Sequence, residues 1–138
     1  MSEARRYNTG KLRWMLMDFE AMEPMIRVLM YGAHKYTIFE GKDGKHIRGV
    51  DISPEEAKGL KIIESGSDNW KAGLDYVQLL ECNQRHQNAI ARGEDIDPES
   101  GLPHIGHKMC NDMFLSWMML HRPDLDNRYS TLQKKKND

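Results

Sequence analysis

Carboxylate and imidazole side chains are concentrated in one stretch of the chain, between residues 81 and 112. The acids are Glu81, Glu94, Asp95, Asp97, Glu99 and Asp112, and the histidines are His86, His104 and His107. Carboxylates suit Mg²⁺ or Mn²⁺, and imidazole shifts the preference towards Mn²⁺, Co²⁺ or another transition metal. These residue types, gathered in one stretch, are therefore consistent with a site that binds a divalent cation.

The same residues also have a simpler explanation. An acidic link between two helices carries solvated carboxylates, and Glu94 or Asp95 can favour the start of the next helix. A lone histidine is more often a hydrogen-bonded structural residue than a metal ligand. The spacing contains nothing as specific as a His-Glu-x-x-His motif. The residue types alone leave both explanations open.

A second group combines cations, aromatic rings and an amide. Its members are Lys11, Trp14, Lys35, Tyr36, Asn69 and Trp70. Lysine side chains bind phosphates, and the faces of Trp and Tyr stack on nucleobases. Each residue taken alone is better explained as a core aromatic or a solvated cation. Together they suggest contacts to a nucleotide.

Hydrophobic periodicity predicts three helices that would position these groups. The first follows an apolar stripe from Phe19 to Ala33, with Asp18 as N-cap and an end near Lys35. Pro24 interrupts this pattern because it lacks an N–H and clashes with the preceding turn. The helix is therefore expected either to begin near Pro24 or to be kinked there.

The other two helices are expected on either side of the acidic link. One should run over residues 70–92, with Gly93 as C-cap, and the other should begin at His104 and end before Pro123. The residues expected to face inward are Leu74, Val77, Leu80, Ile90, Ile105, Met109, Met113, Trp117 and Leu120. On the last helix, His104, His107 and Asn111 share one face. Antiparallel packing of the two helices could direct oxygen and nitrogen ligands from both into one cleft, together with the link carboxylates.

Residues 37–68 differ from the rest of the chain because short β-prone pieces alternate with glycines. The pieces cover residues 46–50 and 60–63, and Asp43-Gly44 is a suitable hairpin turn. Ser53 and Pro54 predict a capped helical turn. The expected fold is mainly α, a small helical bundle with an irregular, β-hairpin-containing insertion or lid at 37–68. One domain is expected over residues 1–138, with a polar tail at 123–138.

Composition excludes several classes of protein. The 20 basic and 21 acidic side chains give a net charge of −1, which argues against a protein that grips duplex nucleic acid. No apolar run approaches the length of a membrane span, and the first residues lack the apolar segment of a secretory signal. Cys82 and Cys110 lie in apolar-periodic segments and are expected to be reduced core thiols. A cytoplasmic location follows as an expectation.

With these residues in view, the sequence resembles the phage MazZ-like dATP/dGTP diphosphohydrolase domain, which is related to MazG-type all-α nucleoside triphosphate pyrophosphohydrolases. The matching segments are YNTGKLRW at 7–14, YGAHKY at 31–36, NWKAGL at 69–74, RH at 85–86 and GEDIDPESGLPHIGH at 93–107. The last segment is the most specific. Two features depart from the family: about thirty residues separate Lys35-Tyr36 from Asn69-Trp70, and the paired Glu-x-x-Glu and Glu-x-x-Asp motifs of the wider MazG group are not cleanly present.

The resemblance implies hydrolysis of a purine deoxynucleoside triphosphate, dATP or dGTP, to monophosphate and pyrophosphate in phage nucleotide metabolism. It implies a fold of the all-α NTP pyrophosphohydrolase type and the cytoplasm of the phage host. We expect Glu81, His86 and Glu94 to act in catalysis, with Asp97, His104 and His107 joining those three as the metal-ligand pool. The expected phosphate contacts are Lys11, Lys35 and Arg85, and the expected base or sugar contacts are Trp14, Tyr36, Asn69 and Trp70.

Because the apolar stripes are generous for three helices, a homo-oligomer is also expected. Two other functions remain open at this point. A non-catalytic protein that sequesters a host signalling nucleotide would keep the cations and aromatic rings but would need no metal. A structural helical adaptor could use the insertion to bind another protein.

Overall fold

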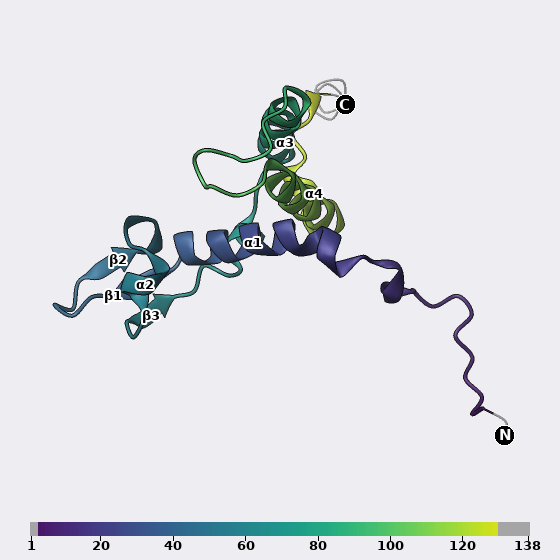
Figure 1. Ribbon diagram of the computed structural model, residues 1–138, viewed down its shortest axis with the longest axis horizontal. Helices are drawn as coiled ribbons and strands as arrows, with labels where there is room; N and C mark the ends of the chain where they lie inside the picture. The colour runs from purple at the N-terminus through teal and green to yellow at the C-terminus, as the bar shows by residue number, and fades with distance from the viewer. Residues whose placement is uncertain (1–2, 130–138) are drawn as a thin grey trace.

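A computed structural model describes residues 3–129 of the chain as three long helices with a small antiparallel sheet (Figure 1). The helices are α1 Phe19–Lys35, the single turn α2 Pro54–Ala57, α3 Tyr76–Ala91 and α4 His104–His121. The strands are β1 Ile38–Glu40, β2 His46–Arg48 and β3 Lys61–Glu64, and short 3-10 turns include η1 Trp14–Leu16 and η3 Asn69–Ala72. The described chain is thus mainly α. None of its helices is long and apolar enough to cross a membrane.

Helix α4 is the central element, because it packs against both α1 and α3 (Figure 1). One apolar cluster joins α1 to α4 and is built on Met25, Val28 and Cys110. A second joins α3 to α4 and is built on Tyr76, Leu79 and Met118, and Tyr76 also donates a hydrogen bond of 3.2 Å to the Met118 carbonyl. The first cluster fixes the middle of α4 against α1, and the second fixes its C-terminal part against α3. A hydrogen bond of 2.6 Å from Asn83 to Asp112 joins α3 to the first half of α4, which carries His104 and His107.

Helix α1 begins at Phe19 and continues through Pro24. Asp18 caps it, since its side chain accepts a hydrogen bond of 3.0 Å from the Ala21 N–H. Of the two expected arrangements, a helix beginning at Pro24 is therefore excluded. The Pro24 carbonyl lies directly against Gly106 of α4, where a Cβ atom would overlap it. This backbone contact lets α1 and α4 approach closely.

Helix α3 is shorter than the periodicity predicts. It begins at Tyr76, and residues 69–72 form a separate 3-10 turn. Gly73 adopts φ +128°, a conformation that favours glycine, and the Asp75 side chain caps α3 by accepting from the Gln78 N–H at 2.8 Å. The prediction of one helix over 70–92 was wrong at its start because a local break and a new cap interrupt an otherwise continuous pattern.

The predicted inward faces were partly wrong. The buried residues of α3 are Tyr76, Leu79, Asn83 and Ala89, and those of α4 are His104, Gly106, Cys110 and Met118. Ile105 and Leu120, expected to face inward, are 46% and 75% exposed. The difference arises because α4 packs against α1 on one side and α3 on the other, so its buried surface is wider than a single apolar stripe. The buried residues Gly106, Cys110 and Met118 each follow a residue that the periodicity predicted to face inward.

The insertion forms a three-stranded antiparallel sheet in the order β2-β1-β3 beside the C-terminal end of α1 (Figure 1). The expected hairpin turn at Asp43-Gly44 is confirmed, with Gly44 at φ +78°, and Ser53 and Glu56 form a capping box on α2. Thr37 fixes the sheet to α1, because its hydroxyl donates to the Ala33 carbonyl at 2.6 Å and accepts from the Gly66 N–H at 2.9 Å.

The predicted tail is ordered over its first residues. Asn127 returns to the start of α3, where its side chain accepts from the Val77 N–H at 3.0 Å and donates to Asp75 at 3.0 Å. Leu125, packed against the Tyr76 cluster, and Asn127 therefore dock the first residues of the predicted tail onto α3, whereas Tyr129 is exposed. The remainder of the predicted tail, residues 130–138, lies outside the described residues.

Candidate functional site

The link between α3 and α4 folds back on itself and holds its acidic residues beside the start of α4. Gly93, at φ +92°, ends α3. The N–H groups of Gly93 and Glu94 donate hydrogen bonds to the carbonyls of Ile90 and Ala89 in the last turn. The link then closes through backbone hydrogen bonds from Asp97 to Leu102 at 2.9 Å and from His104 to Asp95 at 2.9 Å. The expected helix start at His104 is confirmed, and α3 ends as expected at this glycine, with Arg92 as the C-cap residue and Gly93 directly after it.

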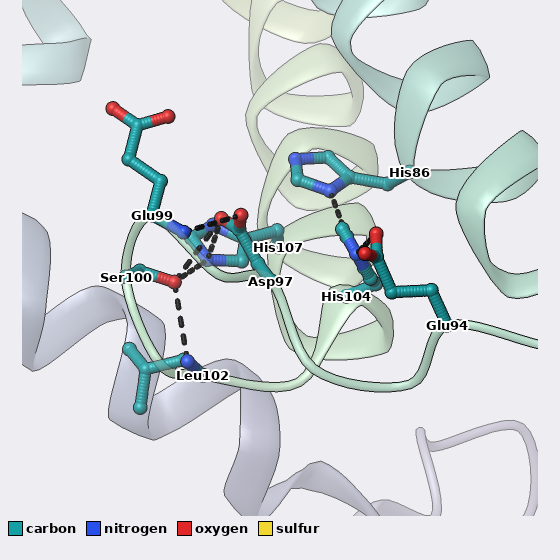
Figure 2. Close-up of polar contacts among 8 residues, drawn as sticks. All are labelled: His86, Glu94, Asp97, Glu99, Ser100, Leu102, His104 and His107. Carbon is teal, nitrogen blue, oxygen red and sulfur yellow. Dashed lines mark hydrogen bonds and ion pairs between the residues drawn. The ribbon is translucent and has the colours of Figure 1, made fainter.

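A chain of three side chains runs from the link to α3 (Figure 2). Glu94 Oε2 lies 2.7 Å from His104 Nε2, and His104 Nδ1 lies 2.8 Å from His86 Nδ1. A carboxylate can only accept, so His104 donates from Nε2 and, in a neutral ring, accepts at Nδ1. His86 must then donate from Nδ1, which places the lone pair of His86 on Nε2. This tautomer is assigned from the hydrogen-bond network.

A second network joins the link to His107 (Figure 2). The Ser100 hydroxyl donates to Asp97 Oδ2 at 3.1 Å and accepts from the Leu102 N–H at 3.2 Å. It lies 2.7 Å from His107 Nε2 and therefore accepts from that nitrogen as well. Asp97 lies 3.4 Å from the same nitrogen of His107. A serine-nucleophile triad is excluded here, because its carboxylate must hold the opposite ring nitrogen.

The two networks meet where the rings of His86 and His107 stack, with centroids 4.8 Å apart and planes 4° from parallel. Burial, followed by the neighbouring rings of His107 and His104, lowers the pKa of His86. Burial likewise lowers the pKa of His107, against the opposing effect of Asp97. Neutral imidazoles are therefore favoured at neutral pH, and a neutral ring offers a lone pair to a proton or a cation.

Asp97 stays ionised in this setting. Burial acts to raise the pKa of its carboxyl, but hydrogen bonds from the Glu99 N–H and the Ser100 hydroxyl, together with His107, lower the pKa overall. Hydrogen bonds to the charged form of a carboxyl group have this effect because they stabilise the anion. The site thus presents neutral imidazoles beside a fixed negative charge.

These groups line a polar cleft of about 550 Å³ between the link, α3 and α1. Three cationic side chains, Lys35, Arg85 and Arg92, line the same cleft. A cleft with several cations beside imidazoles and carboxylates is suited to a multiply charged anion such as a triphosphate.

An apolar groove of about 580 Å³ adjoins the cleft between α1, α3 and α4. The four residues that line both cavities are Tyr31, Lys35, Cys82 and His107. Trp70 lines the groove and stacks on Phe114, with ring centroids 4.5 Å apart. Tyr36 and Asn69 also line it. A charged cleft beside an aromatic groove is a suitable arrangement for the two ends of a nucleotide.

The structure brings together most of the residues expected from the sequence. His86, Glu94, Asp97, His104, His107, Lys35 and Arg85 line the cleft, and Tyr36, Asn69 and Trp70 line the groove. Glu81 is exposed on α3 and lines neither cavity, and Lys11 and Trp14 lie in the segment before α1, away from both.

Sequence reasoning missed Ser100, Arg92 and Tyr31. Ser100 lies in a turn-forming run, and its spacing of seven residues from His107 becomes meaningful only after the link folds back. Arg92 follows the last residue of α3, where a cation is expected for helix stability alone. Tyr31 belongs to the quoted 31–36 segment but had no role assigned.

The donor atoms suit a hard or borderline cation only in part. Within residues 3–129, no three His, Cys, Asp or Glu side chains are gathered as a metal site. His104 uses both ring nitrogens in hydrogen bonds, to His86 and to Glu94. Asp97 and Glu99 line the cleft and provide carboxylate oxygens. One or two carboxylates fit Mg²⁺, which is commonly held by few protein oxygens together with substrate phosphates and water.

Comparison with known proteins agrees with the resemblance drawn from the sequence. A relative from Salmonella phage PMBT28, named dATP/dGTP diphosphohydrolase, is 28% identical over 123 residues. The match covers 89% of this chain and 32% of the relative, so the chain spans about a third of the relative's length. No solved structure matches the chain. Residues 1–128 match the family described as dATP/dGTP diphosphohydrolase, N-terminal, and the chain therefore belongs to that family.

Proposed function

We propose that this domain hydrolyses a purine deoxynucleoside triphosphate, dATP or dGTP, to the monophosphate and pyrophosphate. The observation that supports this most directly is the Glu94–His104–His86 chain, which leaves the Nε2 lone pair of His86 in a cleft lined by three cations. The family and the phage relative's name support the substrate class and a role in phage nucleotide metabolism. The three-helix arrangement is compatible with a bundle of the all-α NTP pyrophosphohydrolase type.

In the proposed binding mode, the triphosphate occupies the polar cleft and the nucleoside extends into the apolar groove. Lys35 lines both cavities and is suited to contact a phosphate near the boundary, while Arg85 and Arg92 contact the phosphates further into the cleft. Trp70 and Tyr36 provide aromatic faces for the base. The residues that line both cavities separate the phosphate-binding cleft from the base-binding groove by a fixed distance. Binding in both cavities therefore also orients the substrate.

Catalysis uses His86 as general base. The oxygen of a water bonds to the α-phosphorus while the bond from that phosphorus to the α–β bridging oxygen breaks, and pyrophosphate leaves with that oxygen. His86 Nε2 accepts the proton that the water loses. His104 and Glu94 keep His86 in the tautomer whose Nε2 carries the lone pair that accepts this proton.

Asp97 is the carboxylate that we propose to hold a divalent cation, Mg²⁺ or Mn²⁺, together with the phosphate oxygens; Glu99 lines the same cleft but points away from Asp97 in Figure 2, and would have to turn to join it. When bound, such a cation neutralises phosphate charge and lowers the pKa of water. Ser100 and the Glu99 N–H fix the Asp97 carboxylate by hydrogen bonds of 3.1 Å each.

The test is incubation of the protein with each deoxynucleoside triphosphate and Mg²⁺ or Mn²⁺ in H₂¹⁸O. Chromatography should show monophosphate and pyrophosphate from dATP or dGTP, with the heavy oxygen in the monophosphate. His86→Gln should lower kcat by about 10²–10⁴-fold, the usual contribution of a general base. The matched control is His46→Gln, which changes an exposed histidine on β2.

Two results would contradict the proposal. Release of inorganic phosphate and a diphosphate would move the reaction to another bond. Tight binding of an intact nucleotide, without turnover under any metal condition, would favour the sequestering protein instead.

A further inference from the structure

The segment before α1, residues 3–18, is an arm whose large apolar side chains stay exposed in the described part of one copy, residues 3–129. In Figure 1 it leaves the start of α1 and runs away from α3 and α4. Its large apolar residues are Tyr7, Leu12, Trp14, Met15 and Leu16, which are 67–84% exposed. The backbone hydrogen bonds of this arm are local, as from Lys11 to Asn8 and from Met17 to Trp14. Water-exposed apolar residues at this density mark a contact surface.

An apolar stripe on α1 is exposed as well. Phe19, Ile26 and Met30 are 62%, 47% and 68% exposed. Their spacings of seven and four residues place them on one face of the helix. Ile26 and Met30 also line the apolar groove, so the stripe and the groove form one continuous surface over the second half of α1. The arm and this surface of α1 are both apolar and exposed, so contact between them would bury apolar area on both.

We infer that two copies of this chain exchange their arms, so that the arm of each lies on the α1 stripe and closes the open side of the groove of the other. In an antiparallel pair of α1 helices, the N-terminus of one helix lies beside the C-terminal half of the other. The groove occupies that half, at residues 26–36. Each arm therefore begins next to the other copy's groove, whereas its own groove lies at the far end of its own helix.

Two observations support a second copy as the partner of the arm: the backbone direction where the arm meets α1, and the apolar area that the arm could bury. Asp18 caps α1 and Met17 is extended at ψ 137°, which directs the chain away from its own groove. Tyr7, Trp14 and Phe19 alone would cover about 450–750 Å² if fully buried, because a buried aromatic side chain covers about 150–250 Å². A stable interface needs about 800 Å² per partner. The aliphatic residues of the arm and the α1 stripe supply the remainder.

Charge supports the same arrangement. Over residues 3–18 the arm carries Arg5, Arg6, Lys11 and Arg13 against two acidic residues, a net charge of +2. The link over residues 93–101 carries four acidic residues and no basic one, and it borders the cleft. Opposite charges at the two surfaces favour encounter and register.

Arm exchange would also complete the nucleotide site, a consequence that rests on the proposed function although the exchange itself does not. Trp14 would form the outer wall of the second copy's groove, and Lys11 would approach the phosphates at the boundary with the cleft. Both residues were expected from the sequence to contact substrate, yet a single copy places neither there. Each site would then contain residues from two chains.

The first test measures mass in solution without substrate, by sedimentation or light scattering. The wild-type chain of 16.1 kDa should have twice that mass. Leu16→Asp should lower the mass to that of one chain, whereas Leu120→Asp, at a similarly exposed leucine of α4, should leave it doubled. A monomeric wild type, or equal behaviour of the two variants, overturns the inference.

The second test fixes where the arm lies, using a short bis-maleimide and the variant Leu12→Cys. Cys82 lines the groove and is accessible, whereas burial raises the pKa of the Cys110 thiol to about 12 and keeps it unreactive. A covalent dimer that disappears on adding Cys82→Ser supports exchange. A crosslink within one chain would mean that the arm closes its own groove, and no crosslink to Cys82 would mean that it lies elsewhere; either result overturns the inference. Both tests are independent of catalysis.

Discussion

His86 and His104 face each other through their Nδ1 atoms at a distance of 2.8 Å, although they belong to different helices. One of these nitrogens must donate and the other must accept. Glu94, at 2.7 Å from the far nitrogen of His104, determines which one donates. The carboxylate on the link thus sets the tautomer of a ring that it does not touch. A positioning role of this kind can be tested separately from a direct role in the reaction.

Glu94→Ala should therefore lower kcat by about 10–100-fold, the usual cost of removing an outer partner that orients a functional imidazole. The KM should change little, because the phosphate-binding cations remain. Nitrogen-15 spectra of labelled histidine should show His86 losing its preference for the Nδ1–H form, a change that a merely structural role would not produce. Glu64→Ala, at an exposed position on β3, is the control. Unchanged kcat together with an unchanged tautomer would contradict the positioning role.

The histidine pair should also make folding stability depend on pH. Burial lowers the pKa of His86 and of His107 in the folded protein, whereas both titrate near 6.5 when unfolded. Below about pH 6.5 the unfolded chain binds more protons, so the free energy of unfolding should fall as the pH decreases towards the folded pKa values. Asp97, whose folded pKa is lowered, adds to this loss only at more acidic pH, near and below its ordinary value of about 3.9.

Urea unfolding at pH 7.5 and pH 5.5 measures this effect. The midpoint should be lower at pH 5.5, and the difference should shrink in the double variant His86→Gln/His107→Gln. His46→Gln, at an exposed position, should keep the wild-type difference. Equal midpoints of the wild type at the two pH values would show that these rings are not held neutral by the fold.

Local features of the fold were predictable because neighbouring residues determine them. The caps at Asp18 and Ser53, the turn at Asp43-Gly44 and the end of α3 at Gly93 all depend on hydrogen bonds over a few residues. The start of α3 was not predictable from periodicity, because Leu74 continues the apolar pattern across the break at Gly73. The buried face of α4 depends on two helices that pack on it, and such information is not local.

The site was predictable in its residue types but not in its connections. Histidines on two helices and carboxylates on the link predicted one cluster, and His86, Glu94 and His104 do meet. No spacing rule reveals that both ring nitrogens of His104 form hydrogen bonds with other side chains of the protein. A histidine with both nitrogens occupied in this way is suited to position a neighbour and has no free lone pair for a metal ion. Ser100 remained unrecognised because a serine in a turn has local uses. The cluster depends on how the link folds back, which only the structure shows.

Arg92 tests whether the cleft binds phosphates, because it lines the cleft and follows the last residue of α3. Arg92→Ala should raise KM for the triphosphate by about 10–100-fold, the effect of losing a hydrogen bond to a charged group. The substitution keeps the hydrogen bond from the residue 92 backbone N–H to the Asn88 carbonyl, so α3 should end at the same residue. Lys58→Ala, which removes an exposed cation paired with Glu55, should leave KM unchanged. An unchanged KM in Arg92→Ala would place the phosphates elsewhere.

Two glycine-to-alanine substitutions should have opposite effects on stability. Gly106→Ala places a Cβ against the Pro24 carbonyl and should force α1 and α4 apart, lowering the free energy of unfolding by about 1–3 kcal/mol. Gly32 lies within α1, and a Cβ there meets nothing within 4 Å. Gly32→Ala should therefore raise the free energy by about 0.5–1 kcal/mol, because alanine loses less conformational freedom in a helix. Denaturant unfolding of the two variants measures both changes. A stabilising Gly106→Ala would show that α1 and α4 do not make this backbone contact. Gly32→Ala is the control for the substitution itself, because its added Cβ meets no atom within 4 Å.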